Sequence, residues 1–200
     1  MTYRELINQV LIRLREDTIT SDWSGAVNDS ITISAYQKVI GSLVNDSKRN
    51  IESFHDWMAL RETVDVSTVA GTKNYNLSSG QELQVLDVTN QSTGYTLKPT
   101  TKHYINTQKY PTESTGEPGY YCFNGVDTSG NLKVDFTPIP TEAQTISFDI
   151  VKYQDNLTLA ATALKIPAQP VILGAWARAL AERGEDGGTQ SSLAAEEQPL

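Results

Sequence analysis

The sequence contains few of the side chains that active sites and metal sites usually require. Its 200 residues include one cysteine, Cys122, and two histidines, His55 and His103. A single cysteine excludes an internal disulfide and a cysteine-rich zinc site, and it indicates a reducing compartment. We expect Cys122 to pack in a strand between Tyr121 and Phe123, and both histidines to be ordinary helix-end or surface groups. These counts argue against a bound metal or cofactor.

Long apolar runs and an excess of positive charge are also absent. No stretch approaches the roughly 20 apolar residues of a membrane span, and the opening MTYRELINQ lacks the apolar core of a secretion signal. The chain has 16 basic and 24 acidic side chains, for a formal net charge of −8. Such a chain is expected not to bind DNA phosphates in general, although DNA could pass along it without adhering. We therefore expect a protein made in the cytoplasm, without a membrane segment.

Catalytic motifs are missing as well. The sequence has no G-x-S-x-G, no phosphate-binding G-x-x-x-x-G-K-[ST] and no H-E-x-x-H. The carboxylates Glu182, Glu185 and Asp186 alternate with Arg178 and Arg183, which favours charge pairing within a helix or between subunits over acid–base chemistry. An enzyme such as a wall hydrolase would need a pair of functional carboxylates, and the sequence places none convincingly. We predict that the protein is not an enzyme.

The clearest secondary structure is a helix near the C-terminus, within residues 166–186. Pro167 and Pro170 suit its first turn, and Gly184 suits the left-handed position that follows its last turn. One face is apolar with helical spacing, which predicts burial against other helices. That face consists of Ile172, Ala175, Trp176, Ala179 and Leu180.

Two helices are predicted near the N-terminus. Thr2 and Glu5 form a capping box for a helix over about residues 3–15. A long helix follows, capped by Asp29 or Ser30 and reaching about residue 58, with an apolar seam of period 3.5. The seam is Ile33, Tyr36, Ile40, Leu43, Ser47, Ile51, Phe54 and Met58. The residues expected in the core of the resulting bundle are Leu6, Leu11, Ile40, Leu43, Phe54, Trp176 and Leu180.

Between these helices the apolar pattern changes to the period of two that is typical of strands. The expected strands cover residues 61–67, 73–77, 83–89, 95–98, 120–123, 132–137 and 145–153, with a short helix near 101–108. Segregated helices and strands predict an α+β fold, with an antiparallel, sandwich-like β block. The expected domains are a helical bundle (1–58 and 166–186), a β-rich domain (59–165) and a C-terminal arm (187–200).

Tyrosines are frequent in the β-rich domain, at Tyr104, Tyr110, Tyr120 and Tyr121. Such rings could form a platform that stacks on sugars or bases. They are also ordinary strand and protein-contact residues. A β module that binds glycans or a receptor is therefore the alternative function.

Several short motifs follow one another in a fixed order along most of the chain. They are Trp57 after the N-terminal helix pair, Gly71-Thr72-x-x-Tyr75-x-Leu77, Pro118-x-x-Tyr121, Gly125, Leu132, Pro138-Ile139-Pro140, Phe148–Tyr153, Ile166-Pro167 and GAWARALAERGED at 174–186. This ordered set resembles the head-to-tail adaptor proteins of tailed bacteriophages, and most closely the tail tubular protein A type.

The resemblance implies a structural protein of the virion neck, made in the host cytoplasm. It implies a twelve-copy ring of this chain, with the portal protein on the helical side, a tail or nozzle protein on the β-rich side, and viral DNA passing the lumen without specific binding. The arm here is short, so either the chain has been shortened or the portal contact differs. Tyr104 and Tyr110 would face the tail. Portal or inter-subunit contacts would come from Arg178, Glu182, Arg183, Glu185, Asp186, Leu193, Glu196, Glu197 and Leu200.

Overall fold

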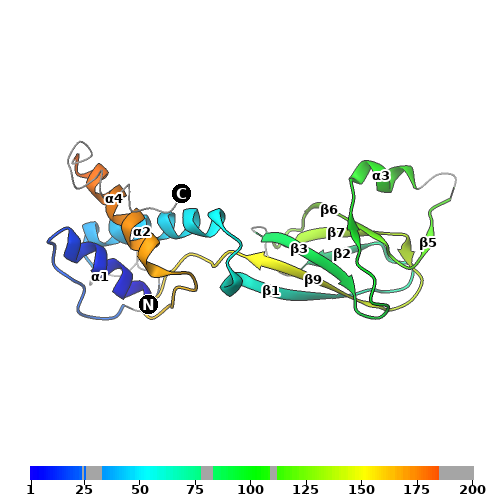
Figure 1. Cartoon of the computed structure of the whole chain (residues 1–200), viewed down its shortest axis with the longest axis horizontal. Coiled ribbons are helices and arrows are strands. Elements are labelled where there is room, and N and C mark those ends of the chain that lie inside the picture. The colour runs from blue at the N-terminus through cyan, green and yellow to red at the C-terminus, as the bar shows by residue number, and fades with distance from the viewer. Residues whose placement is uncertain (24, 26–32, 78–82, 109–111, 185–200) are drawn as a thin grey trace. The chain divides into compact units, whose positions relative to one another are not determined.

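The computed structural model describes residues 1–23, 25, 33–77, 83–108 and 112–184. The chain divides into two compact units: a helical unit of Met1–Ala59 with the residues from Tyr153 onward, and a β unit of Leu60–Lys152. The α+β prediction is confirmed (Figure 1). Residues 153–165, which we expected in the β-rich domain, belong instead to the helical unit.

Three helices pack against one another in the helical unit (Figure 1). Helix α1 spans Tyr3–Arg13 and has the predicted capping box, in which the Glu5 backbone N–H donates to Thr2 Oγ1 and the Thr2 N–H donates to Glu5 Oε2. It ends earlier than expected, since Arg15 adopts a φ of 58°. Helix α4 spans Ala168–Glu182, and Gly184 takes the left-handed conformation predicted for it.

Helix α2 spans Ala35–Phe54 and starts later than the sequence pattern suggested. Its capping box joins Ser34 to Gln37, a glutamine version of the motif found at α1. The expected caps Asp29 and Ser30 lie outside the described residues. The helix also stops before residue 58, and the 3-10 turn η2 (Met58–Leu60) follows.

Side chains of α2 explain why the segment 153–165 joins the helical unit. Asn45 donates to the Leu157 carbonyl at 3.0 Å and accepts from its N–H at 2.8 Å. Lys48 donates to the carbonyl of Gln154, and Glu52 accepts from the Gln154 N–H at 3.4 Å. These residues are spaced i, i+3, i+7 and share one helix face. The segment has no regular ladder of its own, so side chains of α2 and the backbone of residues 1–4 supply its hydrogen-bond partners.

The β unit holds two sheets whose inner faces pack together, as predicted for a sandwich. One sheet has the order β1-β9-β3 and the other the order β2-β7-β6-β4, while β5 and β8 form a small separate pair. The strands are β1 Arg61–Ser67, β2 Asn74–Leu77, β3 Leu83–Asn90, β4 Lys98–Pro99, β5 Thr115–Gly116, β6 Tyr120–Val126, β7 Leu132–Thr137, β8 Ile139–Pro140 and β9 Thr145–Lys152.

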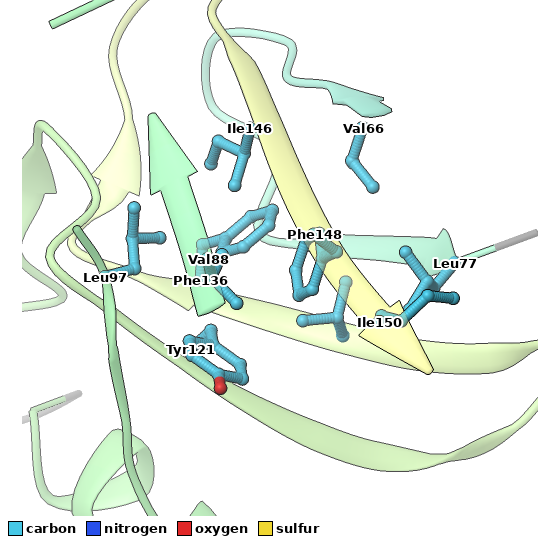
Figure 2. Close-up of a cluster of buried hydrophobic side chains, with 10 residues drawn as sticks. Val66, Leu77, Val88, Leu97, Tyr121, Phe136, Ile146, Phe148 and Ile150 are labelled. Carbon is cyan, nitrogen blue, oxygen red and sulfur yellow. The ribbon is translucent and has the colours of Figure 1, made fainter. Parts of the chain in front are cut away.

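The core of the β unit draws apolar side chains from both sheets. Phe136 of β7 and Phe148 of β9 are fully buried, with ring centroids 6.2 Å apart. Tyr121 of β6 meets the Phe148 ring edge to face at 5.7 Å. Figure 2 shows these rings beside Ile150 and Leu77. Edge-to-face and tilted aromatic pairs add to the burial of apolar area.

The outer face of β7 is covered, contrary to the half-buried pattern that the sequence indicated. Asp135 was expected in solvent but has no exposed surface. It binds Lys102 of the short helix α3 (Lys102–Thr107) and Asn74 of β2. A buried carboxylate needs such partners. The Lys102–Asp135 pair therefore holds α3 against the four-stranded sheet.

Candidate interaction surface

Three residues expected in the helical core, two of them on α2 and the third Trp176 of α4, are not fully buried. Leu6, Leu11, Ile40 and Leu180 are buried, but Phe54 is 68% exposed and Leu43 is half-buried. The seam predicted for α2 was therefore wrong at its C-terminal end. The face that is actually buried includes charged and small residues, because it contacts the 153–165 segment as well as the other helices. That face is Ile40, Gly41, Val44, Ser47, Lys48, Ile51 and Glu52.

Sequence reasoning missed the polar part of that face. Lys48 and Glu52 are each 1% exposed and form an ion pair of 3.1 Å. Burial raises the pKa of Glu52 above the ordinary range, and the neighbouring Lys48 ammonium opposes that rise. From sequence the pair resembles any solvated i, i+4 pair. Asn45, Lys48 and Glu52 are spaced so that they lie on one face of a helix, and this spacing is the signal in the sequence that they contact the same segment.

Trp176 is half-buried, where the sequence analysis placed it in the core. The guanidinium carbon of Arg13, from α1, lies 5.4 Å from the centroid of the Trp176 ring, within the range of a cation–π contact. Its indole N–H is enclosed and has no hydrogen-bond partner among the described residues. Trp176 thus joins α4 to α1 at the rim of the bundle.

We predict that Trp176→Ala lowers the free energy of unfolding by about 2 kcal/mol. Full truncation of a buried tryptophan costs about 3–5 kcal/mol, and here part of the ring already contacts water. Chemical denaturation measures the change, with Ile12→Ala as a control, because Ile12 is 56% exposed on the neighbouring turn of α1. A loss equal to that of a fully buried tryptophan would contradict the half-buried position.

Arg183, expected at a contact between subunits, uses its donors within its own unit. Its Nε donates to the Tyr36 hydroxyl at 2.7 Å, Nη1 donates to the Leu14 carbonyl at 3.4 Å, and Nη2 pairs with Glu16. Burial raises the pKa of the Tyr36 hydroxyl, and the hydrogen bond from Arg183 opposes that rise. Arg183 therefore joins the C-terminal end of α4 to α1 and α2.

The other expected contact residues are only partly described. Glu182 is exposed, and Arg178 is half-buried with Nη1 at 3.3 Å from the Gly174 carbonyl. Tyr104 is half-buried and packs on Tyr120 of β6, with centroids 5.4 Å apart and the rings tilted by 56°. Outside the described residues lie Tyr110, Glu185, Asp186, Leu193, Glu196, Glu197 and Leu200, together with the rest of the arm.

The described part of the chain offers no group of side chains that could hold a metal ion. Cys122 is buried, and burial with nearby Asp135 raises the pKa of its thiol. A thiol in this state is a poor nucleophile.

The two histidines lie at a helix end and on a helix surface. His55 follows α2 and packs edge to face on Trp57, with centroids 5.1 Å apart. His103 is exposed on α3.

None of the described helices is long and apolar enough to cross a membrane.

Comparison with known proteins gives one family. The family model described as SU10 adaptor protein matches residues 1–198. No curated protein gives a significant match. The family match agrees with the resemblance to phage head-to-tail adaptors that the sequence motifs indicate. The chain belongs to the SU10 adaptor protein family.

Proposed function

We propose that this protein is the head-to-tail adaptor of a tailed phage, and that twelve copies form a ring in the virion neck between the portal protein and a tail or nozzle protein. The observation that carries the proposal is the adaptor-family match over residues 1–198. A structural role also suits the described side chains, whose buried charges tie elements together. Ring formation would use heterologous contacts that close on themselves.

The helical unit would face the portal, and the β unit would face the tail. Of the contact residues expected on the helical unit, Arg178 is half-buried and Glu182 is exposed, while Glu185 and Asp186 lie outside the described residues. The donors of Arg183 are already engaged within its own unit, so it would act by positioning the end of α4. On the β unit, Tyr104 and Tyr110 would lie toward the tail.

Viral DNA would pass through the lumen without specific binding. The formal net charge of −8 favours weak repulsion of phosphates, summed over the copies of a ring. Lys102, a basic residue of α3, is paired with Asp135. We therefore expect Lys102 not to hold the DNA.

The alternative glycan-binding function receives less support. A stacking platform needs aromatic faces that lie open to a flat ligand. The Tyr104 and Tyr120 rings are tilted by 56° and pack on each other instead. We therefore favour the adaptor function over a sugar-binding module.

Removing the residues after Asp186 should separate folding from portal binding. We expect the thermal stability to stay nearly unchanged, because α4 ends at Glu182 and its left-handed glycine is Gly184. Portal binding should weaken at least about tenfold, since Leu193, Leu200, Glu196 and Glu197 would be lost as contacts, which corresponds to about 1.4 kcal/mol. Co-sedimentation with purified portal particles measures the affinity, with the full chain as reference. Undiminished binding by the shortened chain would show that the helices alone hold the portal.

A further inference from the structure

Two arginines at the C-terminal end of α1 have no carboxylate partner among the described residues. Elsewhere in the helical unit Arg4 pairs with Asp22 at 2.7 Å, and Arg183 pairs with Glu16. Arg13 instead lies over the Trp176 ring, and Arg15 is exposed. We call Arg13, Arg15 and Trp176 the arginine–tryptophan surface.

The backbone at Arg15 is unusual. Its φ of 58° places it in the left-handed region, directly after the residue that caps α1. Glycine or asparagine normally takes this position, and another residue costs roughly 1 kcal/mol. The end of a helix favours a cation, which explains a positive charge there. The helix end does not explain why the residue in the left-handed conformation is an arginine, since glycine would adopt this conformation without cost.

The surface also has an unused donor. The Trp176 indole N–H is enclosed without an acceptor among the described residues, and a buried donor without a partner costs about 1–3 kcal/mol. Because the indole N–H is enclosed, the groups that the surface offers to a partner are the Arg13 and Arg15 guanidinium groups. A segment that carries carboxylates would complement this surface, because guanidinium groups pair with carboxylates.

Such a segment begins beside this surface. Arg183 is the C-cap of α4, and its side chain contacts the Leu14 carbonyl and Glu16. The C-terminal ends of α4 and α1 therefore lie close together. Residues 185–200 follow Gly184 with four carboxylates, Glu185, Asp186, Glu196 and Glu197, and no lysine or arginine. Sixteen residues can span up to about 50 Å, which is ample for a return to Arg13.

We propose that the arginine–tryptophan surface binds the acidic segment 185–200 of the same chain, with its carboxylates paired to Arg13 and Arg15. Glu16, the acid that follows Arg15, is already engaged by Arg183, and Asp17 is exposed. The contact stands independently of the adaptor function. Where the adaptor function holds, the portal would replace this contact on docking.

Zero-length cross-linking of the full chain tests this proposal without any portal present. A carbodiimide joins a lysine amine to a carboxylate that touches it, so the variants R13K and R15K each introduce a reporter. Mass spectrometry should find cross-links from each substituted position to carboxylates in 185–200. Lys165, an exposed native lysine of the same unit, serves as the internal control. Raising the ionic strength from about 0.05 to about 0.5 M should lower the yield at least about threefold, because exposed ion pairs are screened.

Two results would overturn the proposal. The first is a yield from positions 13 and 15 into 185–200 no higher than that from Lys165. The second is cross-linking mainly between different chains, which a mixture of isotope-labelled and unlabelled protein reveals and which would assign the contact to a second copy. Should R13K disturb the bundle through its Trp176 contact, R15K still gives the answer, since Arg15 is exposed. The absence of portal keeps either failure separate from a failure of the adaptor function.

Discussion

Replacing Lys48 with methionine should destabilise the helical unit by about 3–5 kcal/mol, the usual cost of stranding one member of a buried ion pair. Lys48 and Glu52 are each 1% exposed, so neither charge can turn to solvent without opening the packing between α2 and the 153–165 segment. Lys48 also donates to the Gln154 carbonyl, which would lose its partner. Urea denaturation followed by circular dichroism gives the free energy of unfolding.

The matched control is the double variant K48M/E52L. Buried ion pairs replaced by apolar side chains of similar volume are often neutral or stabilising, although here the N–H and carbonyl of Gln154 would both lose their partners. We therefore expect the double variant to recover at least about half of the loss caused by K48M alone. A double variant that is as unstable as K48M, or less stable, would refute a paired and buried Lys48–Glu52.

Adding one methyl group at Gly174 should cost about 2–3 kcal/mol, because α2 and α4 approach each other closely there. A Cβ at Gly174 would stand 2.1 Å from Ser47 Oγ, far inside contact distance. Overpacking of this kind typically costs about 1–3 kcal/mol, even though alanine is a better helix former than glycine. Denaturant unfolding of Gly174→Ala measures the effect. Gly119→Ala is the control, since a Cβ there meets nothing within 4 Å.

The partner substitution identifies the cause. Ser47 Oγ is buried without a hydrogen-bond partner among the described residues, so Ser47→Ala alone should be neutral or stabilising by up to about 1 kcal/mol. In the S47A/G174A variant the two Cβ atoms would stand about 3.4 Å apart, and most of the lost stability should return. Equal destabilisation with and without Ser47→Ala would place the strain elsewhere.

Local signals in the sequence were enough for much of the fold. The capping box of Thr2 and Glu5 involves residues three apart, so it works whatever the tertiary structure. Strand β7, Leu132–Thr137, was predicted with the correct bounds, because its alternation belongs to the strand itself. Such features need only the neighbouring residues, and sequence reasoning identifies them well.

Features that depend on distant residues were missed. The sequence shows Asp135 as a polar position on a half-buried strand, and only the pairing with Lys102 of α3 explains its burial. Phe54 has the spacing of a core residue, yet α2 turns Glu52 inward to meet Gln154 and leaves Phe54 exposed. In both cases a tertiary contact of charged side chains decides which face is buried. Apolar periodicity carries no information about such contacts.

The portal interaction is equally non-local, and among its expected residues only Arg178, Glu182 and Arg183 lie in the described part of the chain. Arg183 is an example: its alternation with carboxylates indicated pairing within a helix or between subunits, and it was expected at a portal or inter-subunit contact. Its donors are instead used by Tyr36, Leu14 and Glu16. Residue type and spacing could not distinguish the two uses.

Electron microscopy of the purified chain mixed with purified portal particles tests the adaptor function most directly. We expect a closed ring of this protein on one face of the portal, with an open central passage and twelve copies in the ring. Portal particles that stay bare at a saturating concentration of a correctly folded chain would contradict the adaptor function.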